Sequence, residues 1–315
     1  MSRRSFDRFR PLAGACLAGA VLALTACGGG SEEVDEVSRA DVQAARTARG
    51  QAAQRETSAV SHTDRSAQAA SRAAWVPKVT DTWQWQLSGK INTSYDVDVY
   101  DIDLFETPDA VMNTLHSQGR YIVCYFSAGS AEAWRPDYDQ FKKSDLGNNL
   151  DGWPGEKWVD TRSANVRNIM KARLDLAKTR GCDGVEPDNV EAYNNNPGFN
   201  GALTAKTQLD FNRFLATEAH ARGLKIGLKN DIKQLKALEP SFDFAVNEQC
   251  QQYKECGGYE VFTSKGKPVF SAEYKKIWRD DADARAQMCA KARAMNLRTL
   301  VLPLMLNDAF RYSCD

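Results

Sequence analysis

The feature that most constrains the fold is a repeated alternation of short β-rich runs with amphipathic helical segments, beginning near residue 83. Several helical segments end at a glycine that directly precedes the next β-rich run, as Gly119, Gly181 and Gly223 do. Glycine at this place accepts the left-handed conformation that ends many helices. The pattern predicts strands within residues 83–88, 97–105, 120–127, 182–189, 224–230, 242–249, 267–274 and 298–305.

Eight such runs within a domain of about 240 residues match the size and order of a (β/α)8 barrel of the TIM type. The alternative is an open, doubly wound parallel sheet. No glycine-rich phosphate-binding motif follows the first run, and several runs end in acidic or amide residues, which favours the barrel. We therefore expect an α/β barrel domain over residues 77–315.

The N-terminal part of the chain differs in kind from the rest. Basic residues precede an apolar stretch that ends in Leu24-Thr25-Ala26-Cys27, which resembles a bacterial lipobox. We expect residues 1–26 to be a lipoprotein signal peptide and Cys27 to be lipidated; the alternative is an ordinary cleaved signal. Residues 27–76 are rich in Ala, Ser, Gln and Arg and predict a disordered tether. The protein is then exported and anchored on the outer membrane or cell surface by its lipid.

Six of the eight cysteines fall in the expected domain, and an even number in an exported chain favours disulfides. Cys250 and Cys256 are close in sequence and are the first expected pair. A Cys289–Cys314 pair would fasten the C-terminus, which leaves Cys124–Cys182. The spacing is not that of a zinc site, and we expect no metal and no cofactor.

In a barrel of this kind the functional residues lie at the C-terminal ends of the strands. The expected ends carry acids, amides and aromatic residues. They are Gln86, Asp101, Asp103, Tyr125, Ser127, Glu186, Asp188, Lys229, Asn230, Asn247, Glu248, Glu273 and Tyr274. These residues predict a polar site at one mouth of the barrel.

Carboxylate chemistry is the kind that this set of residues supports best. The chain has only three histidines, of which one is in the tether and two are near helix ends, so a histidine-based mechanism is disfavoured. Asp188 and Glu248 follow different strands across one mouth and could form the two-carboxylate pair of a glycosidase. Asp188 could instead stabilise a turn, and Glu248 could bond to backbone. Glu186, two residues before Asp188, is expected to lie deeper.

Two further hypotheses concern ligands. A Mg²⁺ or Ca²⁺ site could be built from Asp101, Asp103, Glu186 and Asp188. The segment 128–161 is long for a barrel loop and contains Trp153 between a glycine and a proline, where an exposed ring could stack on a sugar. Trp153 could equally pin this loop to the barrel.

The ordered motifs WQWQLSG, DVYDIDLF, CYFSAGS, DGWPGE, GCDGVEPDNV, GLKND, FAVNEQC and GKPVFSAEY resemble the endo-α-1,4-polygalactosaminidase-like glycoside hydrolases of family 114. The resemblance runs from about Trp83 to Tyr274. It implies a (β/α)8 barrel, cleavage of α-1,4-linked galactosamine polymers, and catalytic carboxylates at Asp188 and Glu248. Relatives often carry Asp where this chain has Glu186 and Glu191.

A galactosamine polymer with free amines is cationic, so acids at the mouth would attract it. We expect substrate contacts at Gln86, Asp103, Tyr125, Trp153, Glu186, Asn189, Lys229, Glu273 and Tyr274. Lys229 could keep a neighbouring carboxylate ionised. The balanced charge, 41 basic and 41 acidic residues, gives no reason to expect nucleic acid as a partner. We expect a monomer that meets a polysaccharide, and the membrane only through its anchor. The alternatives are a non-catalytic polysaccharide-binding lipoprotein and a metal-dependent hydrolase.

Overall fold

The computed structural model describes residues 74–315, and all structural statements below concern these residues. The expected signal peptide, Cys27 and the tether as far as residue 73 lie outside them. Trp75, which was expected in the tether, is 2% exposed and donates its Nε1–H to Asp81 Oδ2 over 3.0 Å. Its ring packs on Tyr121 and Phe244. The packed domain therefore begins at least two residues before the expected start at 77.

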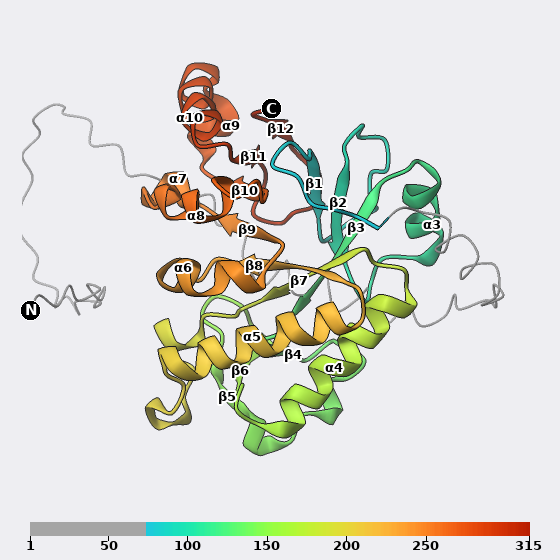
Figure 1. Ribbon diagram of the computed structural model, residues 1–315, viewed down its shortest axis with the longest axis vertical. Helices are drawn as coiled ribbons and strands as arrows, with labels where there is room; N and C mark the ends of the chain where they lie inside the picture. Colours follow the sequence, from blue (N-terminus) through green and yellow to red (C-terminus); the bar gives the residue numbers. More distant parts are fainter. Residues whose placement is uncertain (1–73) are drawn as a thin grey trace, which may run out of the picture. The chain divides into compact units, whose positions relative to one another are not determined.

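A curled sheet forms the centre of the domain, with parallel pairing from its first strand to its eighth (Figure 1). Each predicted β-rich run contains one of these strands, which confirms the (β/α)8 barrel. In sheet order they are β1 (Trp83–Gln86), β2 (Val99–Asp103), β3 (Tyr121–Ser127), β7 (Gly184–Asp188), β8 (Lys225–Lys229), β9 (Phe244–Glu248), β10 (Val269–Glu273) and β11 (Arg298–Val301), followed by the antiparallel β12 (Tyr312–Ser313).

No strand ladder joins β1 to β11. The gap between them is bridged by a side-chain hydrogen bond and by backbone bonds to the segment after β11. Trp83 donates its Nε1–H to the Arg298 carbonyl over 2.9 Å. The backbone amides of Leu87 and Ser88 both donate to the carbonyl of Leu306, which follows β11. The segment after β11 therefore satisfies backbone groups at the edge of β1 that would otherwise be unpaired.

Helices lie outside the strands, as the sequence pattern predicts. They are α3 (Asp109–Ser117), α4 (Ala164–Thr179), α5 (Ala205–Ala221), α6 (Leu235–Leu238), α7 (Cys250–Tyr253), α8 (Glu260–Thr263), α9 (Lys276–Asp280) and α10 (Ala282–Ala294). Ser163, Thr204 and Asp281 cap the N-termini of α4, α5 and α10 with their side chains. The segment 232–240 forms only the short helix α6, because 3₁₀ turns flank it and Pro240 limits its extension.

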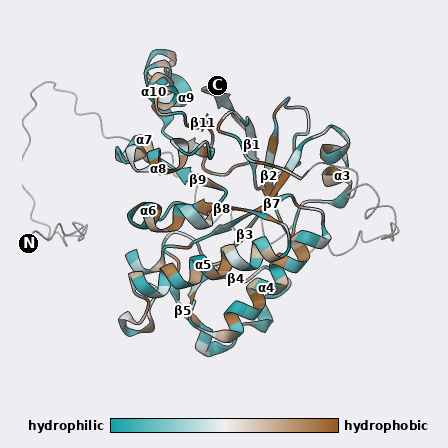
Figure 2. Cartoon of the chain, viewed as in Figure 1, coloured by the Kyte–Doolittle hydropathy of each residue, from teal (hydrophilic) through white to brown (hydrophobic). Residues whose placement is uncertain are grey.

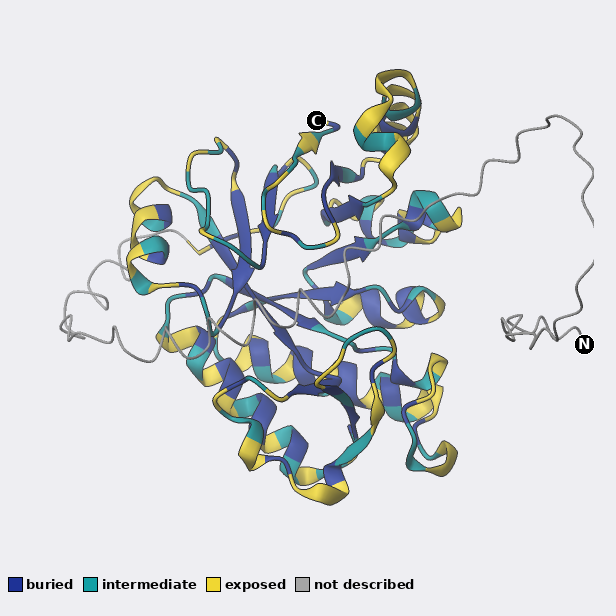
Figure 3. Cartoon of the chain, turned by 180° about the vertical axis from the view of Figure 1, so that it is seen from behind, coloured by how far each residue is buried: buried dark blue, intermediate teal, exposed yellow. Residues whose placement is uncertain are grey.

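The apolar core has two layers, one on each side of the curled sheet. The outer layer packs strand residues such as Ile102 and Ile226 against Leu174 of α4 and Phe211 of α5. Figure 2 shows apolar and polar residues alternating around these two helices, and Figure 3 shows their outer faces exposed. The inner layer includes Trp83 and Trp85, whose rings stack 5.6 Å apart. Both side chains are 1% exposed and serve packing.

The long segment after β3 is not an irregular loop. It contains a three-stranded antiparallel sheet of β4 (Ser130–Glu132), β6 (Glu156–Val159) and β5 (Leu146–Asn149), in that spatial order. Arg135 binds Asp103 at the end of β2 through both terminal nitrogens and also binds Glu132, so it fastens this small sheet to the barrel.

All three expected disulfides are present: Cys124–Cys182, Cys250–Cys256 and Cys289–Cys314. The first joins β3 to Cys182, two residues before β7. The second closes the turn after β9, and the third fastens the C-terminus to α10. Among residues 74–315 no helix combines the length and apolar character needed to cross a membrane.

Candidate active site

Four charged side chains meet at the C-terminal ends of β7, β8 and β9. Lys229 Nζ lies 2.8 Å from Glu186 Oε1, 3.2 Å from Asp188 Oδ1 and 3.3 Å from Glu248 Oε2. The cation is thus shared by three carboxylates from β7 and β9, the two strands that flank β8. The structure brings together four of the residues that the sequence placed at strand ends.

The cluster has a buried floor and an accessible rim. The side chains of Glu186 and Lys229 are 0% and 2% exposed, whereas those of Asp188 and Glu248 are 18% and 27% exposed. Glu186 is two residues from Asp188 on the same face of β7, and its deeper position confirms the expectation. A ligand at the barrel mouth can therefore reach Asp188 and Glu248 but not the floor.

Two tyrosines hold the accessible carboxylates. The Tyr125 hydroxyl donates to Asp188 Oδ2 over 2.9 Å, and the Tyr274 hydroxyl donates to Glu248 Oε1 over 2.6 Å. Burial and the Glu248 charge raise the pKa of Tyr274 well above its ordinary value, so this hydroxyl stays a donor. Each carboxylate is consequently fixed on one oxygen by a phenol and on the other by Lys229.

Lys229 remains charged although it is buried. Burial favours the neutral amine, but Asp188, Glu186 and Glu248 outweigh this effect and raise the pKa of Lys229 well above its ordinary value. The ammonium also lies 4.7 Å from the centre of the Trp85 ring and 5.8 Å from that of Tyr125. Trp85 thus supports the cation as well as packing, a second role that its place in an apolar layer did not indicate.

The residues that follow β7, β8 and β9 share an uncommon backbone conformation. Asn189, Asn230 and Gln249 have φ angles of 60°, 47° and 66°, in the left-handed region. Each directly follows a member of the charged cluster, so the chain turns away from the barrel as soon as the side chain has been placed. Asparagine accepts this region more readily than most residues. The motifs DN and KN at strand ends are the sequence signal for these turns.

Several hydrogen bonds fix these turns. The backbone N–H of Asn189 donates to Asp188 Oδ1 over 2.7 Å, and the side-chain amide of Asn189 donates to Ser127 Oγ over 2.9 Å. Asn230 Oδ1 accepts from the backbone N–H of Glu248 over 3.0 Å, a positioning role that was not predicted. A side chain at Gly129 would overlap the Asn189 carbonyl, so the glycine allows β3 and β7 to meet closely there.

Three expected substrate contacts are turned into the protein. Gln86 and Glu273 are 0% exposed and Asp103 is 5% exposed. Gln86 bonds to the loop after β1, and Asp103 bonds to Arg135 and to the amides of Phe105 and Glu106. Their polar atoms are hydrogen-bonded to residues of the neighbouring loops. A ligand at the mouth would have to displace these partners to reach them.

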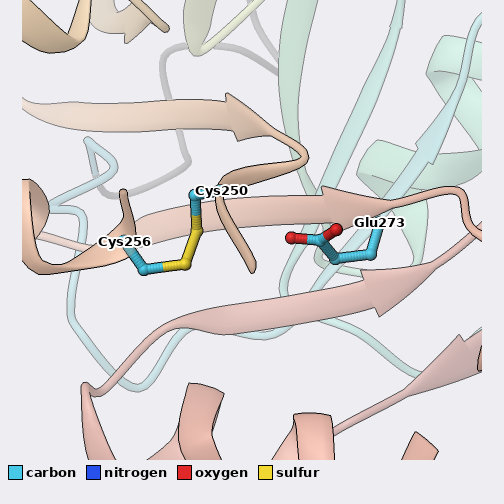
Figure 4. A group of neighbouring side chains, drawn as sticks. All are labelled: Cys250, Cys256 and Glu273. Carbon is cyan, nitrogen blue, oxygen red and sulfur yellow. A yellow bond between two sulfur atoms is a disulfide. The ribbon is translucent and has the colours of Figure 1, made fainter. Parts of the chain in front are cut away.

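Glu273 lies beside the Cys250–Cys256 disulfide and points toward it (Figure 4). Its Oε1 accepts the Gln251 backbone N–H over 2.6 Å, and burial raises its pKa to about 7. Cys250, Cys256 and Glu273 are close enough to surround an ion, but the two sulfurs are bonded to each other and offer no thiolate. Glu273 therefore stabilises the turn that follows Glu248 through its bond to the Gln251 backbone N–H.

The acids of the hypothetical Mg²⁺ or Ca²⁺ site are divided between two protein cations. Asp103 binds Arg135, whereas Glu186 and Asp188 contact Lys229. Asp101 lies on β2 at the floor, 1% exposed, and interacts with Glu186. The arrangement is an ion-pair network with protein cations at the places that a metal would take.

A pocket of about 620 Å³ opens at Asn189, the residue that follows Asp188. It is lined by the β5–β6 hairpin and the segment after β7, and Trp153 and Asn189 are both part of its wall. Trp153 also packs on an apolar cluster beneath the hairpin, so it fastens this segment, and its stacking on a sugar stays a prediction. Amide, aromatic and acidic side chains in one hollow suit a polar, ring-shaped ligand.

Replacement of Lys229 by Met should lower the free energy of unfolding by about 3–5 kcal/mol near neutral pH, because the buried Glu186 would lose its partner and could no longer ionise with the rest of the chain. Burial already raises the pKa of Glu186 to about 7. Without Lys229 the carboxyl would charge only at still higher pH, so stability should fall as the pH rises from ~4.5 through 7. The stability loss should therefore be small at pH ~5 and large at pH ~8, as measured by urea unfolding.

Lys267→Met is the matched control, because Lys267 binds the buried Glu239 at the other end of the domain. Lysine neighbours lower the pKa of Glu239, although burial opposes this effect. Lys267 and Glu239 are both charged above pH ~5. The loss of stability caused by Lys267→Met should therefore be constant from pH ~5 to ~8. The same pH-independent loss in Lys229→Met would contradict the role given to Glu186.

Comparison with known proteins agrees with this geometry. Residues 64–315 match glycoside-hydrolase family GH114. The chain is similar to Ega3 of Aspergillus fumigatus, solved in complex with galactosamine: the identity is 45%, the TM-score is 0.71, and the match covers 78% of this chain and 99% of the Ega3 chain.

Two more distant proteins are also similar. The glycoside hydrolase domain of PelA from Pseudomonas aeruginosa shares the fold at 16% identity, with a TM-score of 0.58 over 74% of this chain and 98% of that domain. An uncharacterized protein of Deinococcus radiodurans is 26% identical over 228 residues, which are 64% of this chain and 71% of that protein. With the match to its family spanning the whole barrel, the chain belongs to glycoside-hydrolase family GH114 and is a glycoside hydrolase.

Proposed function

We propose that the protein cleaves an α-1,4-linked galactosamine polymer within the chain, with Asp188 and Glu248 as the catalytic carboxylates. The observation that carries the proposal is the convergence of these two acids, alone accessible among the acids around Lys229, at the mouth of a GH114 barrel. The similarity to Ega3, solved with galactosamine, supports this sugar.

The hydrogen bonds suggest different roles for the two acids. Asp188 is contacted by Lys229, Tyr125 and the Asn189 backbone N–H, three donors that fix both of its oxygens. We assign Asp188 as the nucleophile that attacks the anomeric carbon. Glu248 is more exposed and has two such partners, and we assign it as the acid that protonates the departing oxygen and later takes a proton from the attacking water.

The shared lysine also limits the distance between the acids. Asp188 Oδ1 and Glu248 Oε2 both lie within 3.3 Å of Lys229 Nζ, so the two oxygens are at most twice that distance apart. Inverting glycosidases separate their carboxyl groups by about 6.5–9.5 Å to admit a water, whereas retaining ones separate them by about 5–5.5 Å. The bound is reached only if the nitrogen lies on the line between the oxygens, which favours retention.

Asp188→Asn and Glu248→Gln should each reduce cleavage of partly deacetylated α-1,4-galactosaminoglycan by about a thousandfold or more. The assay uses residues 74–315 and follows oligosaccharide release, with the initial anomer of the product read by NMR. Retention predicts the α-anomer first. Circular dichroism controls for folding of each variant.

Unchanged cleavage by either variant would remove that residue from the catalytic pair. A β-anomer formed first would contradict the assignment of Asp188 as nucleophile. Binding of the polymer without product from the wild type would instead favour the non-catalytic polysaccharide-binding protein.

We further propose that the pocket at Asn189 binds a sugar unit next to the cleavage point. Its wall contains five asparagines that can bond to hydroxyl groups, together with Trp153, whose ring can cover an apolar sugar face. Glu191 supplies a carboxyl that can bind the ammonium of a deacetylated unit. Burial and repulsion from Asp231 raise the pKa of Glu191 to about 7, and a bound ammonium would favour its ionised form.

Glu191→Gln should raise KM for deacetylated polymer by about tenfold and change KM for fully N-acetylated polymer much less, since one charge-assisted hydrogen bond is lost. Glu260→Gln, an exposed acid on α8, is the control and should alter neither value. Equal increases of KM for both polymers would contradict ammonium recognition by Glu191.

Export and lipid anchoring through Cys27 complete the proposal, supported by the apolar segment and lipobox-like residues 24–27. In a bacterial host, Cys27→Ser in the full chain should move the protein from the membrane fraction to the soluble fraction. Metabolic labelling with a fatty acid should then mark only the wild type. Labelling of the Cys27→Ser variant would contradict the assignment.

A further inference from the structure

The floor of the active site contains one acid that the mechanism above does not use. Asp101 follows Tyr100 on β2, is 1% exposed, and faces Glu186 of β7, which is 0% exposed. Asp101 Oδ1 and Glu186 Oε2 are buried, and neither accepts a bond from an N–H or O–H donor elsewhere in residues 74–315. A buried carboxylate oxygen without a donor is strongly unfavourable.

The two carboxyl groups interact across the floor, and each has a buried oxygen without a donor. Two ionised carboxylates cannot bond to each other, because both have acceptor oxygens only. A proton on one of the two would satisfy an unpartnered oxygen on each side at once. When two acids share a buried site, the charge on one disfavours ionisation of the other.

The surrounding charges decide which acid keeps the proton. Glu186 Oε1 accepts from Lys229 Nζ over 2.8 Å, which favours the anion at Glu186. Asp101 is paired in the sheet with Trp85 on β1 and Val123 on β3. The charges that act on it are Glu186 and Asp188 on β7 and Lys229 on β8, and within residues 74–315 no hydrogen bond joins it to the ammonium. Burial, then the Glu186 charge and hydrogen bond, raise the pKa of Asp101 well above its ordinary value.

We propose that Asp101 holds a proton at neutral pH, donates it to Glu186, and thereby acts as a positioning residue for Lys229 beneath Asp188 and Glu248. With Asp101 neutral, Lys229 is shared by three anions. An ionised Asp101 would add a fourth anion below the ammonium, would repel Glu186, and would draw Lys229 away from the two accessible carboxylates. The inference deepens the proposed function and rests on it only for the kinetic consequence.

The protonation state can be measured without an activity assay. In the folded domain with ¹³C-labelled aspartate carboxyls, isotope-edited infrared spectroscopy should show one protonated aspartate at pH ~8, close to neutrality but where ordinary aspartates are ionised. The band should disappear in Asp101→Asn and in Asp101→Ser. Asp231→Asn is the matched control, because burial raises the pKa of Asp231 only to about 7, and it should keep the band.

No protonated band in the wild type, or a band that survives both Asp101 replacements, would overturn the proposal. This readout holds whatever the substrate is, so its failure is distinct from a failure of the proposed function, which the wild-type cleavage assay reports.

The kinetic test separates positioning from general stability. Asp101→Leu removes the donor and should lower kcat roughly 10- to 100-fold with little change in KM, since one hydrogen bond to a buried charge is lost. Asp101→Asn retains an N–H donor of the same shape and should recover most of kcat. Equal kcat in Asp101→Asn and Asp101→Leu, with both variants folded, would overturn the positioning role.

Discussion

The ammonium of Lys229, buried and in contact with three carboxylates, is the interaction on which the functional end of the barrel depends. A buried charge is tolerated only when opposite charges and hydrogen bonds replace its hydration. Glu186, Asp188 and Glu248 provide this replacement, and in return the lysine brings acids from β7 and β9 together. Moving Asp188 or Glu248 away would leave the buried ammonium of Lys229 with fewer compensating charges, which is unfavourable.

Packing below the lysine gives the cluster its depth. Gly227 precedes Lys229 by two residues on the same face of β8, and a side chain there would overlap the ring of Phe244. The phenyl ring fills the barrel beneath the lysine, and Trp85 lies beside it. Because the barrel is packed to this level, the charged groups are excluded from water on one side and accessible on the other, which is the asymmetry that acid–base chemistry requires.

Sequence patterning was sufficient for the barrel because parallel strands and their crossover helices have strong local periods. It correctly placed Asp188, Glu248 and Lys229 close together, because strand ends of a barrel meet at one mouth. It did not reveal that Gln86, Asp103 and Glu273, which end strands in the same way, are buried. Their side chains bond to neighbouring loops, and nothing in the local sequence distinguishes an acid that faces the mouth from one that holds a loop.

By itself, the sequence determined the eight barrel strands, the helices α3, α4, α5 and α10, the three disulfides and the family, since these rest on local periodicity, on the cysteine count or on ordered motifs. Only the tertiary structure decided that the segment after β3 forms a small sheet and a pocket wall, and that Asp101 faces Glu186 across the floor. The physical reason is that hydrogen bonding, burial and charge pairing depend on distances between residues far apart in the chain. Asp101 and Glu186 are 85 positions apart in sequence, yet a single proton can be shared between them.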